Sequence, residues 1–202
     1  IGIISGLLSQ TGMPFICILI LCAVIAVICS CFNAVIENKF NLPPFLVTLA
    51  MQQVFRGILM LLSNGSPISN LNEGIIYMGQ GYIGPIPFSV LLMLVFIVIG
   101  HIIFSRTQFG RNVIAVGGNP EAARVSGIDV NKTRVYVSAL LGFTIAIMAL
   151  VSCGRIASAQ TTLGGDTVMD IIAAVVIGGT PMGGGSGTVV GTLFGCLVIG
   201  LI

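Results

Sequence analysis

The sequence predicts an all-α polytopic membrane protein: a bundle of transmembrane helices with a short helix outside the membrane and one helix broken by glycines. Composition is the first observation, since 56% of the 202 residues are hydrophobic and 7% are charged, with a mean hydropathy of +1.13. A soluble domain carries about 25% charged residues. The second observation is a series of apolar runs of about 20 residues, the length that crosses a bilayer as a helix. The third is a gathering of cations in one loop.

Four apolar runs are long enough to span the membrane, and each must be helical because lipid offers no partner to backbone groups. They are residues 14–36, 44–62, 86–104 and 135–151. Residues 1–8 look like the end of an earlier span. The chain opens on Ile1 and closes inside an apolar run, so we expect residues 1–202 to form a single transmembrane domain that is a fragment, with spans missing at both ends.

Charges in the loops predict the orientation. The 63–85 loop has Glu73 as its one charged residue, whereas the 105–134 loop is basic. Because cytoplasmic loops are enriched in Lys and Arg, the basic loop is expected on the cytoplasmic side and the 63–85 loop outside. The cations of the basic loop are Arg106, Arg111, Arg124, Lys132 and Arg134, against Glu121 and Asp129.

A short capped helix is predicted within the basic loop, where residues 117–128 read GGNPEAARVSGI. Asn119 is a good N-cap and Pro120 suits the first helical position. Gly127 can end the helix in the left-handed conformation. About two turns of helix are not stable alone in water, so we expect this helix to dock on a partner. The expected docking residues are Gly118, Asn119, Pro120, Glu121, Ala122, Ala123, Arg124 and Gly127.

The apolar run 171–202 is broken by GGTPMGGGSG at residues 178–187. We expect a helix that enters at Ile171, capped by Asp166, Thr167 and Asp170, with Thr167 and Asp170 resembling a capping box. A second helix is expected near Ser186 or Thr188. The break either lines a wet cavity, as in the discontinuous helices of transporters, or lets helices pack closely. Whether the first half re-enters or crosses the membrane stays open.

A polar stripe is predicted on the second complete span, where Thr48, Gln52 and Arg56 follow a four-residue spacing and share one helix face. An intramembrane Arg usually faces a cavity or a partner, so the stripe is a candidate lining of a solute pathway. The alternative is that Arg56 pairs within the bundle or extends to the interface. The glycines of the break complete the candidate pathway: Gly178, Gly179, Gly183 and Gly184.

Four motifs in chain order resemble one family. They are NLPPFLVTLAMQQVFRGI, RTQFGRNVIAVGGN, GGNPEAARVSGI and DIIAAVVIGGTPMGGGSGTVVGTLFG. Together they resemble sugar-type ABC importer permeases, the ribose-permease-like branch of binding-protein-dependent transport. In this comparison Glu121, Ala122, Ala123 and Gly127 match the motif that couples the permease to its ATPase. Pro181 and Met182 depart from the family pattern, which affects the local shape of the break.

The resemblance implies a multi-pass permease subunit of a bacterial or archaeal cytoplasmic membrane. Its expected partners are a second permease subunit (identical or different), a cytoplasmic ATPase that holds ATP and magnesium, and an extracytoplasmic solute-binding protein. The expected function is import of a monosaccharide or similar small polar solute by alternating access. Nucleosides, a signalling furanose and branched-chain amino acids are alternative cargoes, and an ion-coupled secondary transporter or a channel are rival classes.

The sequence itself offers no catalytic, cofactor or metal site. It has no Gly-x-x-x-x-Gly-Lys-Ser/Thr phosphate loop, so we expect ATP hydrolysis on another subunit and no enzymatic activity here. The six cysteines lack metal-type spacing with the single His and are interpreted as small hydrophobic residues. A net charge of +2 without an aromatic-rich basic patch gives no sign of nucleic-acid binding.

Overall fold

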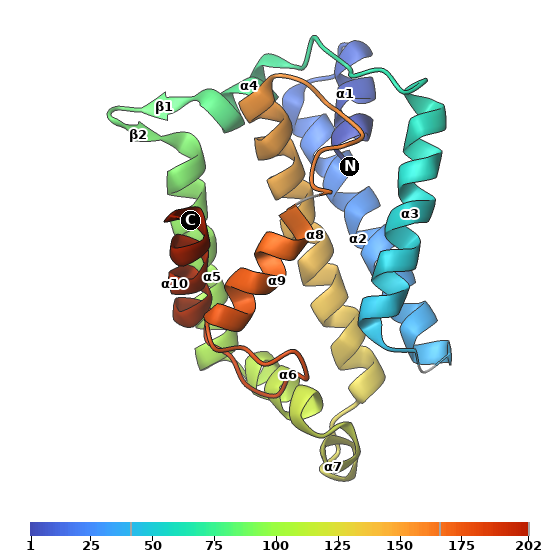
Figure 1. Cartoon of the computed structure of the whole chain (residues 1–202), viewed down its shortest axis with the longest axis vertical. Helices are drawn as coiled ribbons and strands as arrows, with labels where there is room; N and C mark the ends of the chain where they lie inside the picture. The colour runs from blue at the N-terminus through green and yellow to red at the C-terminus, as the bar shows by residue number, and fades with distance from the viewer. Residues whose placement is uncertain (41, 166, 202) are drawn as a thin grey trace. The chain divides into compact units, whose positions relative to one another are not determined.

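The computed structural model describes residues 1–40, 42–165 and 167–201, which form helices joined by loops and one very short β-hairpin (Figure 1). The chain divides into two compact units, Ile1–Val90 with Val135–Leu163, and Leu91–Arg134 with Gly164–Ile202. The elements are α1 (Gly2–Gln10), α2 (Phe15–Phe40), α3 (Pro44–Leu62), α4 (Glu73–Gln80), β1 (Tyr82–Ile83), β2 (Ile86–Pro87), α5 (Phe88–Arg106), α6 (Gln108–Gly118), α7 (Pro120–Val125), α8 (Val130–Ile156), α9 (Thr167–Ile177) and α10 (Val189–Leu201).

Four of the described helices are long and apolar enough to cross a membrane: α2, α3, α5 and α8. They correspond to the four predicted spans, which confirms the all-α membrane fold. The bounds of α3 are those predicted, whereas α2 and α8 are longer, with 26 and 27 residues. Hydropathy marks only the most apolar part of a helix, and these two helices extend beyond it to include Lys39 and Lys132.

Close backbone contacts at glycines hold the first unit together. A Cβ added at Gly142 of α8 would lie 2.7 Å from the carbonyl oxygen of Ala26 in α2. On the same helix, Gly154 lies against the backbone of α4 at Ile75 and Gly79. Small residues allow helices in membranes to approach at backbone distance, where van der Waals contact replaces the hydrophobic driving force.

The loop that follows α3 in the first unit is more ordered than predicted. Asn72 caps α4 by accepting a hydrogen bond from the Gly74 N–H at 2.9 Å, and β1 pairs with β2 antiparallel. Farther back in the chain, Ile68 exchanges two backbone hydrogen bonds of 2.9 Å with Ala159. Short elements of this kind carry too little periodicity to be recognised in a loop sequence.

In the second unit the chain turns sharply after α5, because Gly110 of α6 lies directly on the backbone of Phe104. The Thr107 hydroxyl accepts a hydrogen bond from the Gly110 N–H at 3.2 Å and caps α6. The sequence interpretation missed this helix and treated its residues as loop. Its 11 residues end at Gly118, and Asn119 lies between α6 and α7.

The glycine-broken segment forms a hairpin of two antiparallel helices, α9 and α10. Gly195 faces Ala174, and Gly178 faces Gly191. Because α9 has 11 residues, it rises about 16 Å, roughly half the hydrocarbon thickness. The chain turns back after α9 and returns along α10, so the two arms form a short helical hairpin.

The predicted start of this hairpin is wrong. The first arm begins at Thr167, four residues before Ile171, so Thr167 lies inside the helix and does not form the N-cap of a capping box. Asp170 lies in the first turn of α9, and Asp166 lies outside the described residues. The start of α10 is confirmed, since the Thr188 hydroxyl accepts a hydrogen bond from the Gly191 N–H at 3.0 Å.

Candidate functional site

The short helix of the basic loop is α7, and both of its predicted ends are confirmed. Asn119 Oδ1 accepts a hydrogen bond from the Ala122 N–H at 3.0 Å, and Pro120 occupies the first helical position. At the other end Gly127 has a φ of +82°. The Gly127 N–H donates to the Arg124 carbonyl and the Ile128 N–H donates to the Ala123 carbonyl, both at 3.0 Å. This pattern is the Schellman motif, which satisfies the last carbonyls of a helix.

One face of α7 is anchored to its own chain. Ala123 is 4% exposed and packs in a core with Val116 of α6 and Val130 of α8. The side chain of Ile128 packs on the same core, which completes the apolar contact that accompanies a Schellman motif. The structure therefore assigns Ala123 to the attachment of α7, whereas the sequence prediction counted both alanines among the docking residues.

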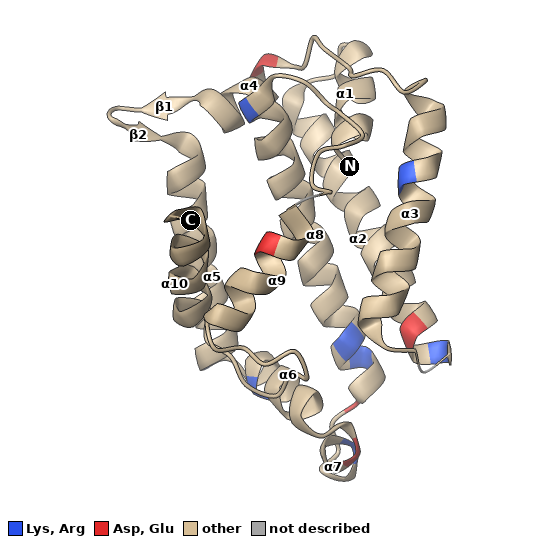
Figure 2. Ribbon diagram, viewed as in Figure 1, with Lys and Arg blue, Asp and Glu red and all other residues tan. Residues whose placement is uncertain are grey.

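The opposite face of α7 is open and carries an apolar side chain. Val125 is 90% exposed, and Ala122 is also exposed. Glu121 and Arg124 form an ion pair of 3.4 Å with both side chains in solvent, so α7 presents both signs of charge (Figure 2). An exposed pair of this kind contributes little to stability and stays available to a partner. Val125 and the two charged side chains thus leave this face of α7 open to contact.

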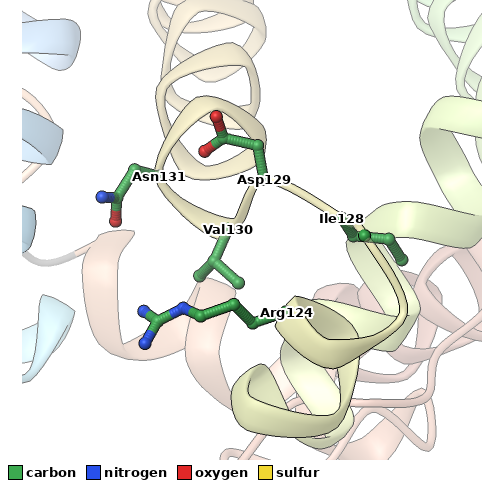
Figure 3. A pocket seen from close by; sticks show the side chains of 6 residues that line it. Arg124, Ile128, Asp129, Val130 and Asn131 are labelled. Atoms are coloured by element: carbon green, nitrogen blue, oxygen red, sulfur yellow. The ribbon is translucent and has the colours of Figure 1, made fainter.

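A hollow of about 340 Å³ adjoins α7 where the chain enters α8 (Figure 3). Asp129 caps α8 at its edge, since Oδ1 accepts a hydrogen bond from the Lys132 N–H at 3.0 Å and Oδ2 lies 3.1 Å from Lys132 Nζ. The backbone N–H of Lys132, with its ammonium, holds the pKa of Asp129 below the ordinary value. Asp129 and Lys132 thus place an ion pair at the edge of the hollow. Its lining residues are Arg124, Gly127, Ile128, Asp129, Val130 and Asn131.

The candidate pathway glycines serve different purposes in the hairpin. Gly178 is a close-packing position, because a Cβ there would lie 2.6 Å from the Gly191 carbonyl oxygen. Gly179 and Gly184 have φ values of +88° and +80°, which L-residues rarely adopt. Gly183 has no atom of the described chain within 4 Å of an added Cβ. Close packing and backbone turning thus both account for the glycine-rich break.

The polar stripe of α3 lies at the border of its packed side. Val47 is buried, Gln52 is half-buried, and Thr48 and Arg56 are exposed. The Thr48 hydroxyl donates to the carbonyl oxygens of Pro44 and Phe45, at 3.0 and 3.1 Å. Among the described residues Arg56 has no ion-pair partner, so its guanidinium group is available to interact with another molecule. The stripe belongs to the first unit and the hairpin glycines to the second.

Three features of the site were missed from the sequence. Val125 was not recognised, although it is the one large apolar residue between Asn119 and Gly127, and its position opposite a buried alanine could have indicated it. Asp129 was counted as a loop charge, although Asp before an apolar helix is a regular N-cap signal. The helix α6 was missed as well, although Thr107 is a regular N-cap residue before an amphipathic run and could have indicated it.

The known proteins that this chain resembles in sequence are transport permeases. A family model described as "Branched-chain amino acid transport system / permease component" matches residues 2–202. The ribose import permease protein of Bacillus subtilis strain 168 is 40% identical over 172 residues, which cover 84% of this chain and 53% of that protein. The ribose import permease protein of Haemophilus influenzae is 35% identical, over 100% of this chain and 64% of that protein.

A galactose/methyl galactoside import permease protein of Escherichia coli K12 is 36% identical, over 96% of this chain and 60% of that protein. The chain therefore spans between about half and two thirds of the length of these curated relatives. No solved structure matches the chain.

Proposed function

The chain belongs to the transport-permease family whose model it matches, and on this premise we propose that it forms the membrane subunit of an ATP-driven importer for a monosaccharide or a similar small polar solute. Import permeases for ribose and galactose are its relatives at 35 to 40% identity. These names support the sugar branch to which the four sequence motifs pointed. The proposal includes placement in a bacterial or archaeal cytoplasmic membrane.

The single observation that carries the proposal is the two-faced helix α7. Its buried Ala123 ties it to α6 and α8, and its exposed Val125 projects from the opposite face on the side that the basic loop assigns to the cytoplasm. A groove on an ATPase subunit would receive Val125, while Glu121 and Arg124 would meet polar groups at its rim. ATP and magnesium would be bound by that subunit.

In the proposed cycle, closure of the ATPase pair displaces α7 and biases the bundle between two orientations of its cavity. A second permease subunit would complete the pathway, and an extracytoplasmic binding protein would deliver the solute. The Thr48, Gln52 and Arg56 stripe and the glycines of the α9–α10 turn would border the route. Hydroxyl, amide and guanidinium groups suit a sugar, because they exchange hydrogen bonds with several ring hydroxyls.

The experiment uses the complete protein, purified in mild detergent, with Val125→Asp as the test variant and Tyr82→Asp in β1 as the matched control. Both side chains are exposed, at 90% and 65%, so the new charge needs no burial in the isolated chain. We expect the wild type and Tyr82→Asp to retain an ATPase that carries a phosphate loop, and Val125→Asp to lose it. ATP-dependent uptake of labelled D-ribose, D-galactose and L-leucine into vesicles then identifies the cargo class.

Uptake that continues in energised vesicles without ATP, together with a chain that purifies without any ATPase, would contradict the proposal. Uptake of L-leucine alone would keep the ATP-driven mechanism and exclude the sugar cargo.

A further inference from the structure

Two glycine pairs from distant parts of the chain meet within the second unit. Gly117 and Gly118 end α6, and Gly184 and Gly185 lie in the turn between α9 and α10, alongside α6 in Figure 1. A Cβ at Gly117 would lie 2.8 Å from the Gly185 nitrogen, and a Cβ at Gly185 would lie 2.7 Å from the Gly118 Cα. The two segments therefore touch through backbone atoms, with no side chain between them.

The α6 side of this contact is fastened to the docking helix. Asn119 alone separates α6 from α7, and it belongs to both helices: its N–H donates to the Ala115 carbonyl at 3.1 Å and its side chain caps α7. Val116 of α6 and Ala123 of α7 share one core. A displacement of α7 therefore carries the end of α6 with it.

The turn is equally fastened to the hairpin. The Thr180 N–H donates to the Val175 carbonyl at 3.1 Å, and the Gly184 N–H donates to the Pro181 carbonyl at 3.0 Å. On the return arm, a Cβ at Gly187 would lie 2.7 Å from Thr180 Oγ1. Since the turn is internally bonded, a push at Gly184 and Gly185 reaches both arms instead of being absorbed by a loose loop.

We propose that the contact of Gly117 and Gly118 with Gly184 and Gly185 is the joint through which movement of α7 reaches the α9–α10 hairpin. This inference rests on the proposed function, since the ATPase supplies the movement. Backbone surfaces without interlocking side chains can pivot on one another while they stay in contact. Coupling between sites travels through packed elements with two arrangements, and the hairpin would be that element.

The test uses the complete permease, assembled with its ATPase and binding protein in proteoliposomes, with Gly117→Ala as the principal variant. The new methyl group must separate α6 from the turn. We expect assembly and ATP hydrolysis to stay within about twofold of wild type while solute uptake per ATP falls about tenfold. The matched control is Gly100→Ala in α5, whose Cβ would meet Val189 at an ordinary 3.9 Å and which should transport as wild type does.

A second variant covers the case in which Gly117→Ala fails to assemble. It approaches the joint from the turn: a Cβ at Gly185 would lie 2.7 Å from the Gly118 Cα, and in Gly185→Asn the new residue tolerates the φ of +85° better than other L-residues do. We expect the same loss of uptake with hydrolysis retained. Normal uptake per ATP in an assembled variant of either kind would overturn the joint. Absence of any ATPase on the wild-type chain would instead refute the proposed function, before the variants are compared.

Discussion

The short helix α7 and the hairpin α9–α10 belong to the same unit and both depend on glycine, yet they are built in opposite ways. In α7 the glycine stands at the end, where Gly127 at φ +82° closes a Schellman motif. In the hairpin, Gly178, Gly191 and Gly195 stand within and between the arms, where the backbones touch. Hydrogen bonds between neighbouring residues end α7, and Val125 is exposed on its outer face. The hairpin is instead held together by backbone contact between its own two arms.

This difference separates two uses of small residues in a membrane protein. Local capping fixes where a helix begins and ends and leaves its outer face free for a partner. Backbone contact fixes how two helices pack and leaves no space for a side chain between them. Substitutions should therefore have different consequences in the two elements, and the largest effect is expected at the backbone contacts of the hairpin.

The largest effect is expected for Gly195→Ala in α10. The methyl group would run into the Ala174 carbonyl oxygen, a backbone atom that cannot move aside, so we expect a loss of about 3 kcal/mol, at the upper end of ordinary overpacking. The thermal midpoint in detergent measures it. In Gly200→Ala, whose Cβ meets no described atom within 4 Å, the midpoint should stay or rise slightly because alanine favours helix. Equal midpoints for the two variants would contradict the hairpin packing.

Next come the two faces of α7, compared by Ala123→Asp and Val125→Asp. The first places a carboxylate in a core that is 4% exposed, so we expect a loss of about 3 kcal/mol and of the ATPase together. The second adds a charge at a 90% exposed position and should change stability by less than about 0.5 kcal/mol while the ATPase is lost. Thermal midpoints and co-purification measure both. A stable Ala123→Asp variant that keeps its ATPase would show that the faces are assigned wrongly.

A smaller effect is expected for Gly127→Ala. No described atom lies within 4 Å of the added Cβ, so the cost is the left-handed backbone alone, about 1 kcal/mol. Gly127→Asn is the matched variant, because asparagine adopts this conformation more readily and should recover part of the loss. The midpoint of thermal unfolding again serves as the readout. If alanine and asparagine cost the same, the conformation is not the cause.

The smallest effect concerns Asp129, the cap of α8. Because the Lys132 N–H and ammonium hold its pKa below the ordinary value, ionised Asp129 adds stability above the unfolded-state pKa, near pH 4. That stability is lost as the pH falls through the lower, folded-state pKa. Asp129→Asn keeps a capping oxygen and removes the charge. We expect the difference in thermal midpoint between wild type and variant to shrink below about pH 4, and a difference independent of pH would contradict this role.

The sequence predicted α7 almost completely because its signals are local. Asn119, Pro120 and Gly127 each act within a few residues, and all three occupy their expected positions. The family resemblance was predictable for the same reason, since its motifs are contiguous. The membrane spans followed from composition and length, which need no knowledge of tertiary packing.

The rest depended on contacts between distant residues. The sequence left open whether the glycine break lines a cavity or packs closely, and the answer for Gly178 comes from Gly191 across the turn. Ala122 and Ala123 are adjacent residues of the same type, and packing against Val116 and Val130 decides which of them is buried. The start of α9 was misplaced because Thr167 and Asp170 fit a capping box as well as the first turn of a helix.

Site-directed photocrosslinking from α7 tests the proposed docking face at the level of single residues. The complete protein would carry p-benzoylphenylalanine at position 125, with the same group at position 82 in the β1–β2 hairpin as the control. Illumination in native membranes should link position 125 to an ATPase subunit with a phosphate loop, and position 82 should give no such product. A product with the ATPase at position 82 and none at position 125 would contradict the assignment of α7 as the docking helix.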